Sequence, residues 1–525
     1  MQFTPKLLVI ACLSFFTFGL ANAFSDTTLE AKASNAFNMA KQNPLTLQAF
    51  LYRMPKGGDI HNHILGAVYA ESYIQQAAED KLCVSLTSFA LSPEQTSGGI
   101  NFCPHHSVLA SQALGAGQEN IDVYNGMLRA FSLLNFVPGQ ESAHDHFFGV
   151  FNKISAAKKH YAVWVDEITS RAAAQNEQYL ELLFSEKCEA CDALAQKLQG
   201  QSATSLMQAN SILKSWHFDK DILATQALVQ NIEQDRRNIE KCGTPNAQPA
   251  CQVTVRYLNE VLRGLPKEHV FARMAFVFQL LEAEAQSPHP LWVGLNLVMP
   301  EDHHYAMTDY TEHMQILQFL KSQLKNKDKV HISLHAGELA PGLVPPAGLK
   351  NHIRQAVEIG SAERIGHGVD VMHEENPESL LQKMAEKNIL VEINLTSNAQ
   401  ILNVSGKDHP LLVYRKNNVP VTLTTDDEGI ERTDLSREYK RAVESYDFNY
   451  KDLKSFARNS LTYSFLPGEN LWKQHTAYEV KTPCANDHPQ SEKLSSSCYA
   501  FLKSNEKAAQ QWELEKRFWR FESKL

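Results

Sequence analysis

The sequence lacks several features that would place it in common classes of protein. After residue 23 it has no apolar run of the roughly 18 residues that a membrane-spanning helix needs. It has no cluster of basic residues, and with a net charge of −9 at pH 7 nucleic acid is not expected as a partner. It has no internal repeat and no low-complexity segment, which disfavours repeat architectures. The expected partner is therefore a small molecule.

The start of the sequence is typical of a secretory signal peptide. Lys6 precedes the apolar run 7–20, and Ala21-Asn22-Ala23 fits a cleavage site after Ala23. A transmembrane anchor is the alternative, but the run is short for a span. We expect removal of residues 1–23, no membrane span in the mature form, and a secreted or periplasmic protein.

Of the nine cysteines, Cys12 lies in the apolar run, and the other eight fall in four couples that are close in sequence. In an exported protein this pattern indicates disulfide bonds. The expected pairs are 83–103, 188–191, 242–251 and 484–498. The 188–191 couple is alternatively half of a zinc site or a redox motif, but the sequence has no second C-x-x-C to complete a zinc site and no thioredoxin-like pattern around it.

Eight short apolar segments are predicted to be strands, and most precede a segment with helical periodicity. They are 58–66, 179–184, 253–257, 291–298, 330–335, 364–367, 389–394 and 419–424. The alternation predicts a closed parallel (β/α)8 TIM barrel, with a doubly wound open sheet as the alternative. Polar, chemically competent residues end four of these strands. That distribution favours the barrel, whose active sites lie at the C-terminal ends of its strands.

The other segments are assigned around the barrel by composition and periodicity. The assignments are a helical leader at 24–52, the barrel at 53–480, insertions at about 82–160 and 187–250, and a disulfide-linked tail helix at 481–525. Glycine, serine and proline punctuate residues 82–140, which is typical of irregular loops. We interpret His105, His106, His144 and His146 as loop or surface histidines.

A metal site is predicted from the ends of three strands. Side chains two apart on a strand point the same way, so His61 and His63 can bind one metal ion. His335 supplies a third imidazole and Asp426 a carboxylate. This ligand set on zinc leaves a position for water, and zinc lowers the pKa of that water toward neutrality.

Three further residues accompany these ligands. Glu338 lies just beyond His335, and a carboxylate that is near a metal but not bound to it can transfer protons. His367 ends the sixth strand between two glycines, which let backbone and ligand approach closely. Asp427 is placed to contact a substrate.

Together these motifs resemble the adenosine deaminases of the amidohydrolase superfamily, and they look closest to the secreted branch related to adenosine deaminase growth factors. The segments that carry the resemblance are Met54-Pro55-Lys56-Gly57-Gly58-Asp59-Ile60-His61-Asn62-His63, His335-Ala336-Gly337-Glu338, Arg364-Ile365-Gly366-His367-Gly368, Asn394-Leu395-Thr396-Ser397-Asn398, Thr425-Asp426-Asp427 and 459–468.

The resemblance implies a hydrolase that converts adenosine, or a related 6-aminopurine nucleoside, to inosine and ammonia. The ligands of one Zn2+ would be His61, His63, His335 and Asp426. Glu338 would protonate purine N1, and His367 and Asp426 would orient the attacking hydroxide. Asp427 would hydrogen-bond purine N7.

Two positions depart from the family pattern. Leu65 stands where many adenosine deaminases have an aspartate that contacts the ribose 5′-hydroxyl. Met299 stands where the family has a glycine whose N–H meets purine N3, and it retains that N–H. We interpret the neighbouring His303-His304 pair as a surface loop rather than a pocket lining. The exact nucleoside therefore stays open.

Two other functions fit part of the pattern. One is a different amidohydrolase acting on a cyclic amide or ester, although no lysine ends the mid-barrel strands to bridge two metals. The other is a secreted nucleoside-binding or signalling protein with incidental activity, against which the intact Glu338, metal ligands and Asp427 argue. The second zinc deaminase type is disfavoured, because its H-x-E and P-C-x-x-C motifs are absent as a pair. The sequence leaves the oligomeric state open and is compatible with a homo-oligomer.

Overall fold

Eight parallel strands form one sheet in the computed structural model, which describes residues 27–139, 141–199, 213, 216–475 and 477–525. The strands are β1 (Gly57–His63), β7 (Glu177–Phe184), β8 (Thr254–Leu262), β9 (Trp292–Val298), β10 (His331–Ala336), β11 (Arg364–His367), β12 (Leu390–Ile393) and β13 (Val421–Leu423). Each strand pairs with the next in this order. All eight predicted strands are confirmed. The predicted signal peptide lies outside the described residues.

The sheet closes into a barrel through the residues that follow β13. Asn62 and Asp426 form an isolated parallel bridge. The amide of His63 donates to the carbonyl of Asp426 (3.0 Å), and the amide of Asp426 donates to the carbonyl of His61 (2.9 Å). The end of the last strand is thereby joined to the first, as a (β/α)8 barrel requires. The open-sheet alternative is wrong.

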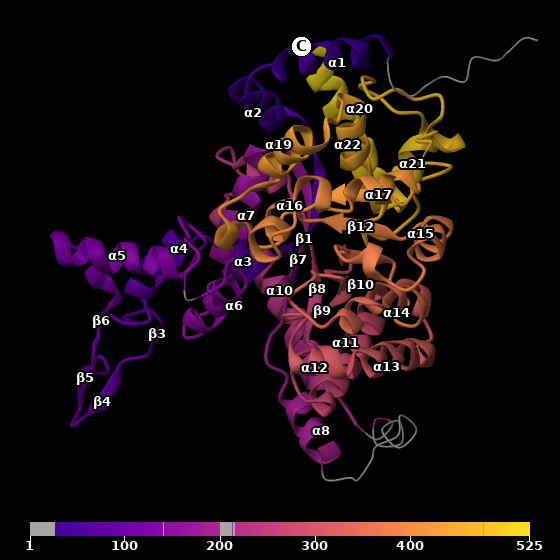
Figure 1. Cartoon of the computed structure of the whole chain (residues 1–525). Helices are drawn as coiled ribbons and strands as arrows, with labels where there is room; N and C mark the ends of the chain where they lie inside the picture. Colours follow the sequence, from indigo (N-terminus) through magenta and orange to yellow (C-terminus); the bar gives the residue numbers. More distant parts are fainter. Residues whose placement is uncertain (1–26, 140, 200–212, 214–215, 476) are drawn as a thin grey trace, which may run out of the picture.

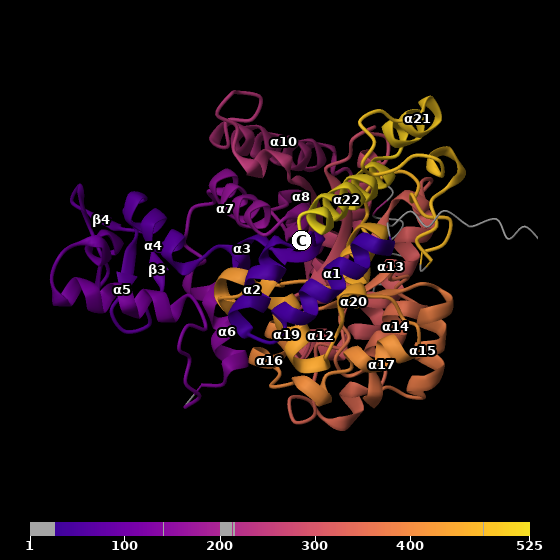
Figure 2. The same ribbon diagram turned by 90° about the horizontal axis from the view of Figure 1, so that it is seen from above.

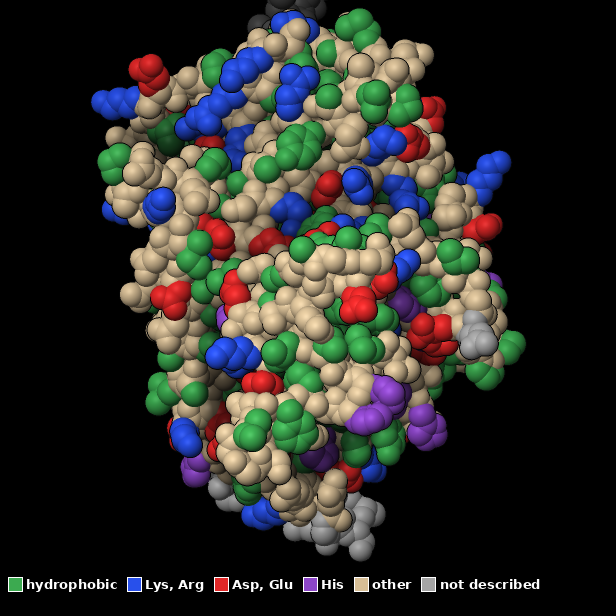
Figure 3. Space-filling model, turned by 90° about the vertical axis from the view of Figure 1, so that its left-hand side faces the viewer, with side chains coloured by type: hydrophobic (Ala, Val, Ile, Leu, Met, Phe, Trp, Pro, Cys, Tyr) green, Lys and Arg blue, Asp and Glu red, His purple; other side chains and the backbone are tan. Residues whose placement is uncertain are grey.

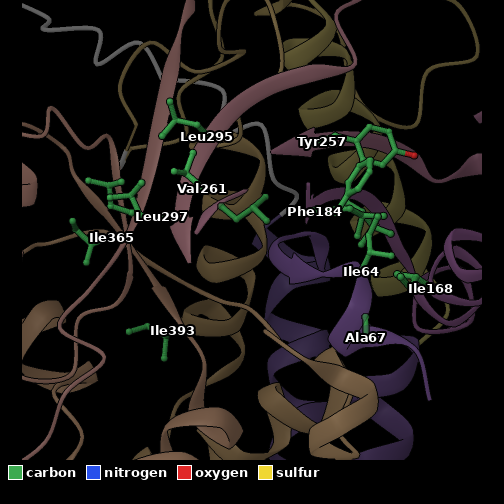
Figure 4. Close-up of a cluster of buried hydrophobic side chains, with 14 of the residues drawn as sticks. Ile64, Ala67, Ile168, Phe184, Tyr257, Val261, Leu295, Leu297, Ile365 and Ile393 are labelled. Atoms are coloured by element: carbon green, nitrogen blue, oxygen red, sulfur yellow. The ribbon is translucent and has the colours of Figure 1, made fainter. Parts of the chain in front are cut away.

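Helices surround the strands on the outside of the barrel (Figures 1 and 2). The main covering helices are α7 (Tyr161–Ala174), α10 (Asp219–Ile239), α11 (Lys267–Glu284), α13 (Tyr310–Gln323), α14 (His352–Glu358), α15 (Pro377–Glu386), α17 (Leu411–Lys416) and α20 (Tyr450–Thr462). Strands buried on both faces read as nearly continuous apolar runs. Val261, Leu295, Ile365 and Ile393 from four of these strands are buried, and Figure 4 shows them with their neighbours.

The segment 82–140 has more regular structure than its composition predicted. It contains α5 (Gln118–Ala130) and two small antiparallel sheets of strands two or three residues long. Together they form an arm beside the barrel (Figure 1, left). Strands this short leave no readable alternation, so the prediction of irregular loops was wrong here. On the face shown in Figure 3, acidic and basic side chains are interspersed.

The four predicted disulfide pairs are present: Cys83–Cys103, Cys188–Cys191, Cys242–Cys251 and Cys484–Cys498. The tail forms two helices rather than one, α21 (Ser496–Ser504) and α22 (Glu506–Ser523). Trp512 and Phe518 of α22 are buried, as expected for a docked helix. Among the helices of the described ranges, none has both the length and the apolar character needed to cross a membrane.

Candidate metal centre and active site

The predicted metal ligands meet at the C-terminal mouth of the barrel. Nε2 of His335 lies 3.1 Å from Nε2 of His61 and 3.3 Å from Nε2 of His63. Oδ1 of Asp426 lies 3.3 Å from Nε2 of each of the two β1 histidines. In a tetrahedron with metal–ligand bonds of 2.0–2.1 Å, the ligand atoms are roughly 3.3 Å apart. These four distances match that spacing, as expected for ligands of one ion.

Three acceptors fix which nitrogen of each ring carries the proton. Nδ1 of His61 donates to Glu392 (2.7 Å), and Nδ1 of His63 donates to Glu260 (2.6 Å). Nδ1 of His335 donates to the side-chain oxygen of Asn296 (2.9 Å). In its neutral form each ring turns the lone pair of its Nε2 toward the common centre. This arrangement of outer hydrogen bonds is typical of histidines that bind a metal.

The carboxylates around the centre favour a positive charge there. Burial alone would lower the pKa of His61, but hydrogen bonds to Asp426 and Glu392 raise it to about 9. The pKa of His335 is instead well below its usual value, because the ring is buried and lies beside other imidazoles. The site thus stabilises positive charge but resists protonating all of its rings. A divalent cation meets both conditions, since it binds the neutral imidazoles and competes with protons.

Gly366 makes room for this arrangement. It pairs with Glu392 on β12 and with His335 on β10. A Cβ at Gly366 would lie 2.7 Å from Cε1 of His61 and 3.5 Å from Oε2 of Glu392. A side chain would therefore displace the His61 ring from the carboxylate that orients it.

His367 lies in the same cluster, but its ring is oriented differently. Its Nδ1 accepts a hydrogen bond from the side-chain amide of Asn398 (2.9 Å), so Nε2 carries the proton. His409 donates to the amide oxygen of Asn398 (3.0 Å) and its own Nδ1 accepts from the backbone of Leu411 (3.2 Å), which fixes the orientation of the amide. Burial lowers the pKa of His367 to about 3, so the ring is neutral. His367 is therefore placed as a hydrogen-bond donor within a cluster that also holds His61, His335 and Asp426.

Glu338 is the proton-transfer candidate, and its carboxyl group faces the cluster. Its Oε1 lies 3.9 Å from Nε2 of His367. Burial and the nearby charge of Asp426 raise the pKa of Glu338 to about 8. The side chain is therefore protonated at neutral pH and can donate.

Asp427 is buried, and its Oδ1 has no hydrogen-bond partner among the described residues. It lies against Gly66, where a Cβ would clash with its carboxylate. Burial raises the pKa of Asp427 well above its usual value, so it too can hold a proton.

Asp426 and His367 adopt φ of +67° and +68°, a region that L-residues rarely occupy, and such strain is concentrated at functional sites.

A cavity of about 510 Å³ opens onto the cluster and is lined by all but two of the predicted site residues. Its lining includes His63, His335, Glu338, Met299, Asp426 and Asp427, while His61 and His367 lie buried beneath it. His303 also lines the cavity, so its assignment to a surface loop was wrong, whereas His304 is exposed as predicted. Met299 adopts a φ of +86°, a backbone conformation suited to glycine.

Part of the cavity wall comes from the first insertion. Helix α6 (Ala143–Lys153) contributes Phe147, Phe148 and Phe151. His144 of this helix lies 3.3 Å from Asp302 and is largely shielded, which corrects its assignment to the surface. The phenylalanine spacing resembles that of any amphipathic helix, so the sequence carried no signal for this role.

Comparison with known proteins agrees with the geometry. Residues 225–480 match the family model described as adenosine deaminase. The adenosine deaminase of Klebsiella pneumoniae subsp. pneumoniae is 35% identical over 137 residues, 26% of this chain and 38% of that protein. The enzyme of Clostridium perfringens (strain 13) is 29% identical over 148 residues, 28% of this chain and 41% of that protein. The chain thus spans about two fifths of the length of the curated relatives it matches.

A solved structure extends the likeness in fold. The crystal structure of Arabidopsis N6-mAMP deaminase has a TM-score of 0.51 and 18% sequence identity, covering 80% of this chain and 96% of that one. At this identity the match shows the barrel fold alone.

Proposed function

We propose that this chain, which belongs to the adenosine deaminase family, is an exported zinc-dependent enzyme that converts adenosine or a related 6-aminopurine nucleoside to the 6-oxo nucleoside and ammonia. One observation carries the proposal. Nε2 of His335 lies 3.1–3.3 Å from Nε2 of His61 and His63, and both of these lie 3.3 Å from the carboxylate of Asp426, with Glu338 beside the cluster.

The proposed metal ligands are His61, His63, His335 and Asp426. A divalent metal there supplies a Lewis acid that makes hydroxide available near neutral pH. Zinc suits this set of imidazoles and one carboxylate, although other divalent metals also bind such ligands.

The remaining residues bind the purine and move protons. Purine N1 and N7 are acceptors, so each needs a donor. Glu338, protonated at neutral pH, donates to N1 and makes C6 more electrophilic. Burial raises the pKa of Asp427, and its protonated form donates to N7. The Nε2–H of His367 orients the oxygen that attacks C6, and the backbone N–H of Met299 faces N3.

Export and domain limits form part of the proposal. The four disulfide bonds are compatible with an oxidising compartment, secreted or periplasmic. We place the catalytic unit at 53–480, with the described part of the leader, 27–52, and the tail 481–525 packed on it. N-terminal sequencing of exported protein should begin at Phe24.

The proposal is tested by mixing zinc-loaded protein with adenosine and following the ultraviolet shift to inosine. Glu338→Gln should reduce kcat by about 10²-fold or more while retaining the metal. His61→Ala should lose the metal itself, whereas the exposed His217→Ala should keep one ion per chain. A folded, metal-loaded protein that leaves every 6-aminopurine nucleoside unchanged would refute the proposal.

A further inference from the structure

The cavity has an acidic floor and an apolar outer wall. Four carboxyl groups lie at the floor: Glu260, Glu338, Asp426 and Asp427. The outer wall is built mainly from apolar side chains, among them Leu65, Phe147, Phe148, Phe151, Leu262 and Val298. Neither lysine nor arginine lines this cavity within the part of the chain that is described.

The outer wall is a fixed part of the fold. The side chain of Ser142 caps the start of α6 by accepting from the amide of Asp145 (3.0 Å). His146 contacts the carbonyl of Arg129 (3.0 Å), which ties α6 to the arm. On the other side of the cavity, Tyr73 donates to the carbonyl of Leu65 (2.8 Å). The apolar side chains of the wall are therefore expected to keep facing the cavity.

The position of the reacting atoms decides what meets this wall, and this step rests on the proposed function. A 6-aminopurine must place C6 and N1 at the floor, beside Asp426 and Glu338. The opposite end of the base carries the sugar, which then points outward to Leu65 and the phenylalanines. The 5′ group of the sugar is the part of the substrate farthest from the floor.

We propose that the preferred substrates are uncharged 6-aminopurine nucleosides whose 5′ position carries an apolar group, as in the 5′-deoxy class. A 5′-hydroxyl against Leu65 and the phenylalanines loses water without gaining a partner from these side chains, and an unpaired buried hydroxyl is costly. A 5′-phosphate meets neither lysine nor arginine among the described lining residues, and its charge would lose water against the apolar wall. The apolar wall thus selects the 5′-deoxy nucleoside over adenosine and excludes the nucleotide.

The test compares kcat/KM of the zinc-loaded full chain for adenosine, 5′-deoxyadenosine and adenosine 5′-monophosphate. We expect 5′-deoxyadenosine to exceed adenosine about fivefold or more, and the nucleotide to fall below adenosine by at least about 100-fold. A smaller preference for the deoxy nucleoside, or a nucleotide rate near that of adenosine, overturns the inference and leaves the proposed function intact. No turnover of any of the three overturns both.

Variants of the wall supply a second test. Leu65→Asn offers the 5′-hydroxyl a partner and should shift the ratio toward adenosine by about fivefold or more. The exposed Leu412→Asn, on α17, is the matched control and should leave the ratio unchanged. Phe151→Tyr adds one hydroxyl to the wall at nearly constant volume and tests the same shift if the first variant fails to fold. An unchanged ratio in both wall variants would contradict the inference.

Binding gives a readout that does not depend on turnover. In Glu338→Gln, calorimetry should show a lower Kd for 5′-deoxyadenosine than for adenosine, by the same fivefold or more. A Kd that is equal or lower for adenosine would overturn the inference.

Discussion

Glu301 accepts a hydrogen bond from the backbone amide of Glu338, with 2.8 Å between the amide nitrogen and Oε2. Its other oxygen accepts from the amide of Gly337 (3.1 Å) and from Nδ1 of His352 (2.6 Å). Burial opposes the charge of Glu301, but Arg263 and His352 lower its pKa to about 2. This buried anion therefore fixes the loop that presents the proposed general acid.

Glu301→Gln should consequently impair proton transfer without removing the metal. Both carboxylate oxygens of Glu301 accept hydrogen bonds. In glutamine one of these positions is an NH2 group, which would face a donor N–H instead of accepting from it. The Glu338 loop must therefore shift. A displacement of about 1 Å can cost 10²-fold in rate, so kcat should fall about 10- to 100-fold while KM changes little. Steady-state kinetics together with metal content would measure both effects.

The same variant leaves Arg263 buried without a full counter-charge, which should cost about 3–5 kcal/mol of stability. Glu312→Gln, on the surface of α13, is the control and should be neutral. If the folded Glu301→Gln protein kept the wild-type kcat, Glu301 would serve stability alone.

Asn398 is predicted to set the tautomer of His367. Asn398→Asp replaces the donating amide with an acceptor of the same shape, so His367 must move its proton to Nδ1 or become charged. In a serine protease triad the analogous loss of tautomer control costs about 10⁴-fold in kcat, and we expect a fall of about 10²–10⁴-fold here. Asn246→Asp, on an exposed loop, should retain full activity. A normal kcat in Asn398→Asp, with normal zinc content, would show that Asn398 does not control the tautomer of His367.

The barrel and the proposed metal ligands could be predicted from the sequence, but the residues that support these ligands could not. Strands buried on both faces read as apolar runs, and His61, His335 and Asp426 stand where such runs end. Glu260, Asn296 and Glu392 lie within strands and look like ordinary buried polar residues until strand register brings them beside the histidines. Three-dimensional pairing of distant segments carries that information, and local periodicity does not.

The apolar outer wall of the cavity could not be predicted from the sequence for a similar reason. The phenylalanines of α6 lie more than 80 residues after β1 in the sequence, and only the fold brings them over the cavity. The departure at Leu65 was visible in the sequence, but its meaning depends on the apolar residues that surround it in space.

Gly366 provides a test of the metal centre that leaves every ligand in place. In Gly366→Ala the new methyl group would lie 2.7 Å from the His61 ring, so the ring must rotate away from Glu392. Loss of such an outer hydrogen bond typically weakens metal affinity 10- to 100-fold. Competition with a chromogenic chelator would measure it. Gly139→Ala is the control because nothing lies within 4 Å of its added Cβ. Equal zinc affinity in the two variants would mean that His61 does not depend on this contact.

The direction of the pH dependence distinguishes the proposed acid from a base. Burial and Asp426 raise the pKa of Glu338 to about 8, and a metal bound to Asp426 would offset part of that charge. The protonated form is the one that donates to purine N1. We therefore expect kcat/KM to fall as pH rises, with a midpoint at or below about 8 and a slope approaching tenfold per pH unit. Measurement of kcat/KM for a 6-aminopurine nucleoside between pH 5 and 10 would show this decrease. If Glu338 instead acted first as an ionised base, kcat/KM would rise through the same range, so the sign of the slope decides between the two roles.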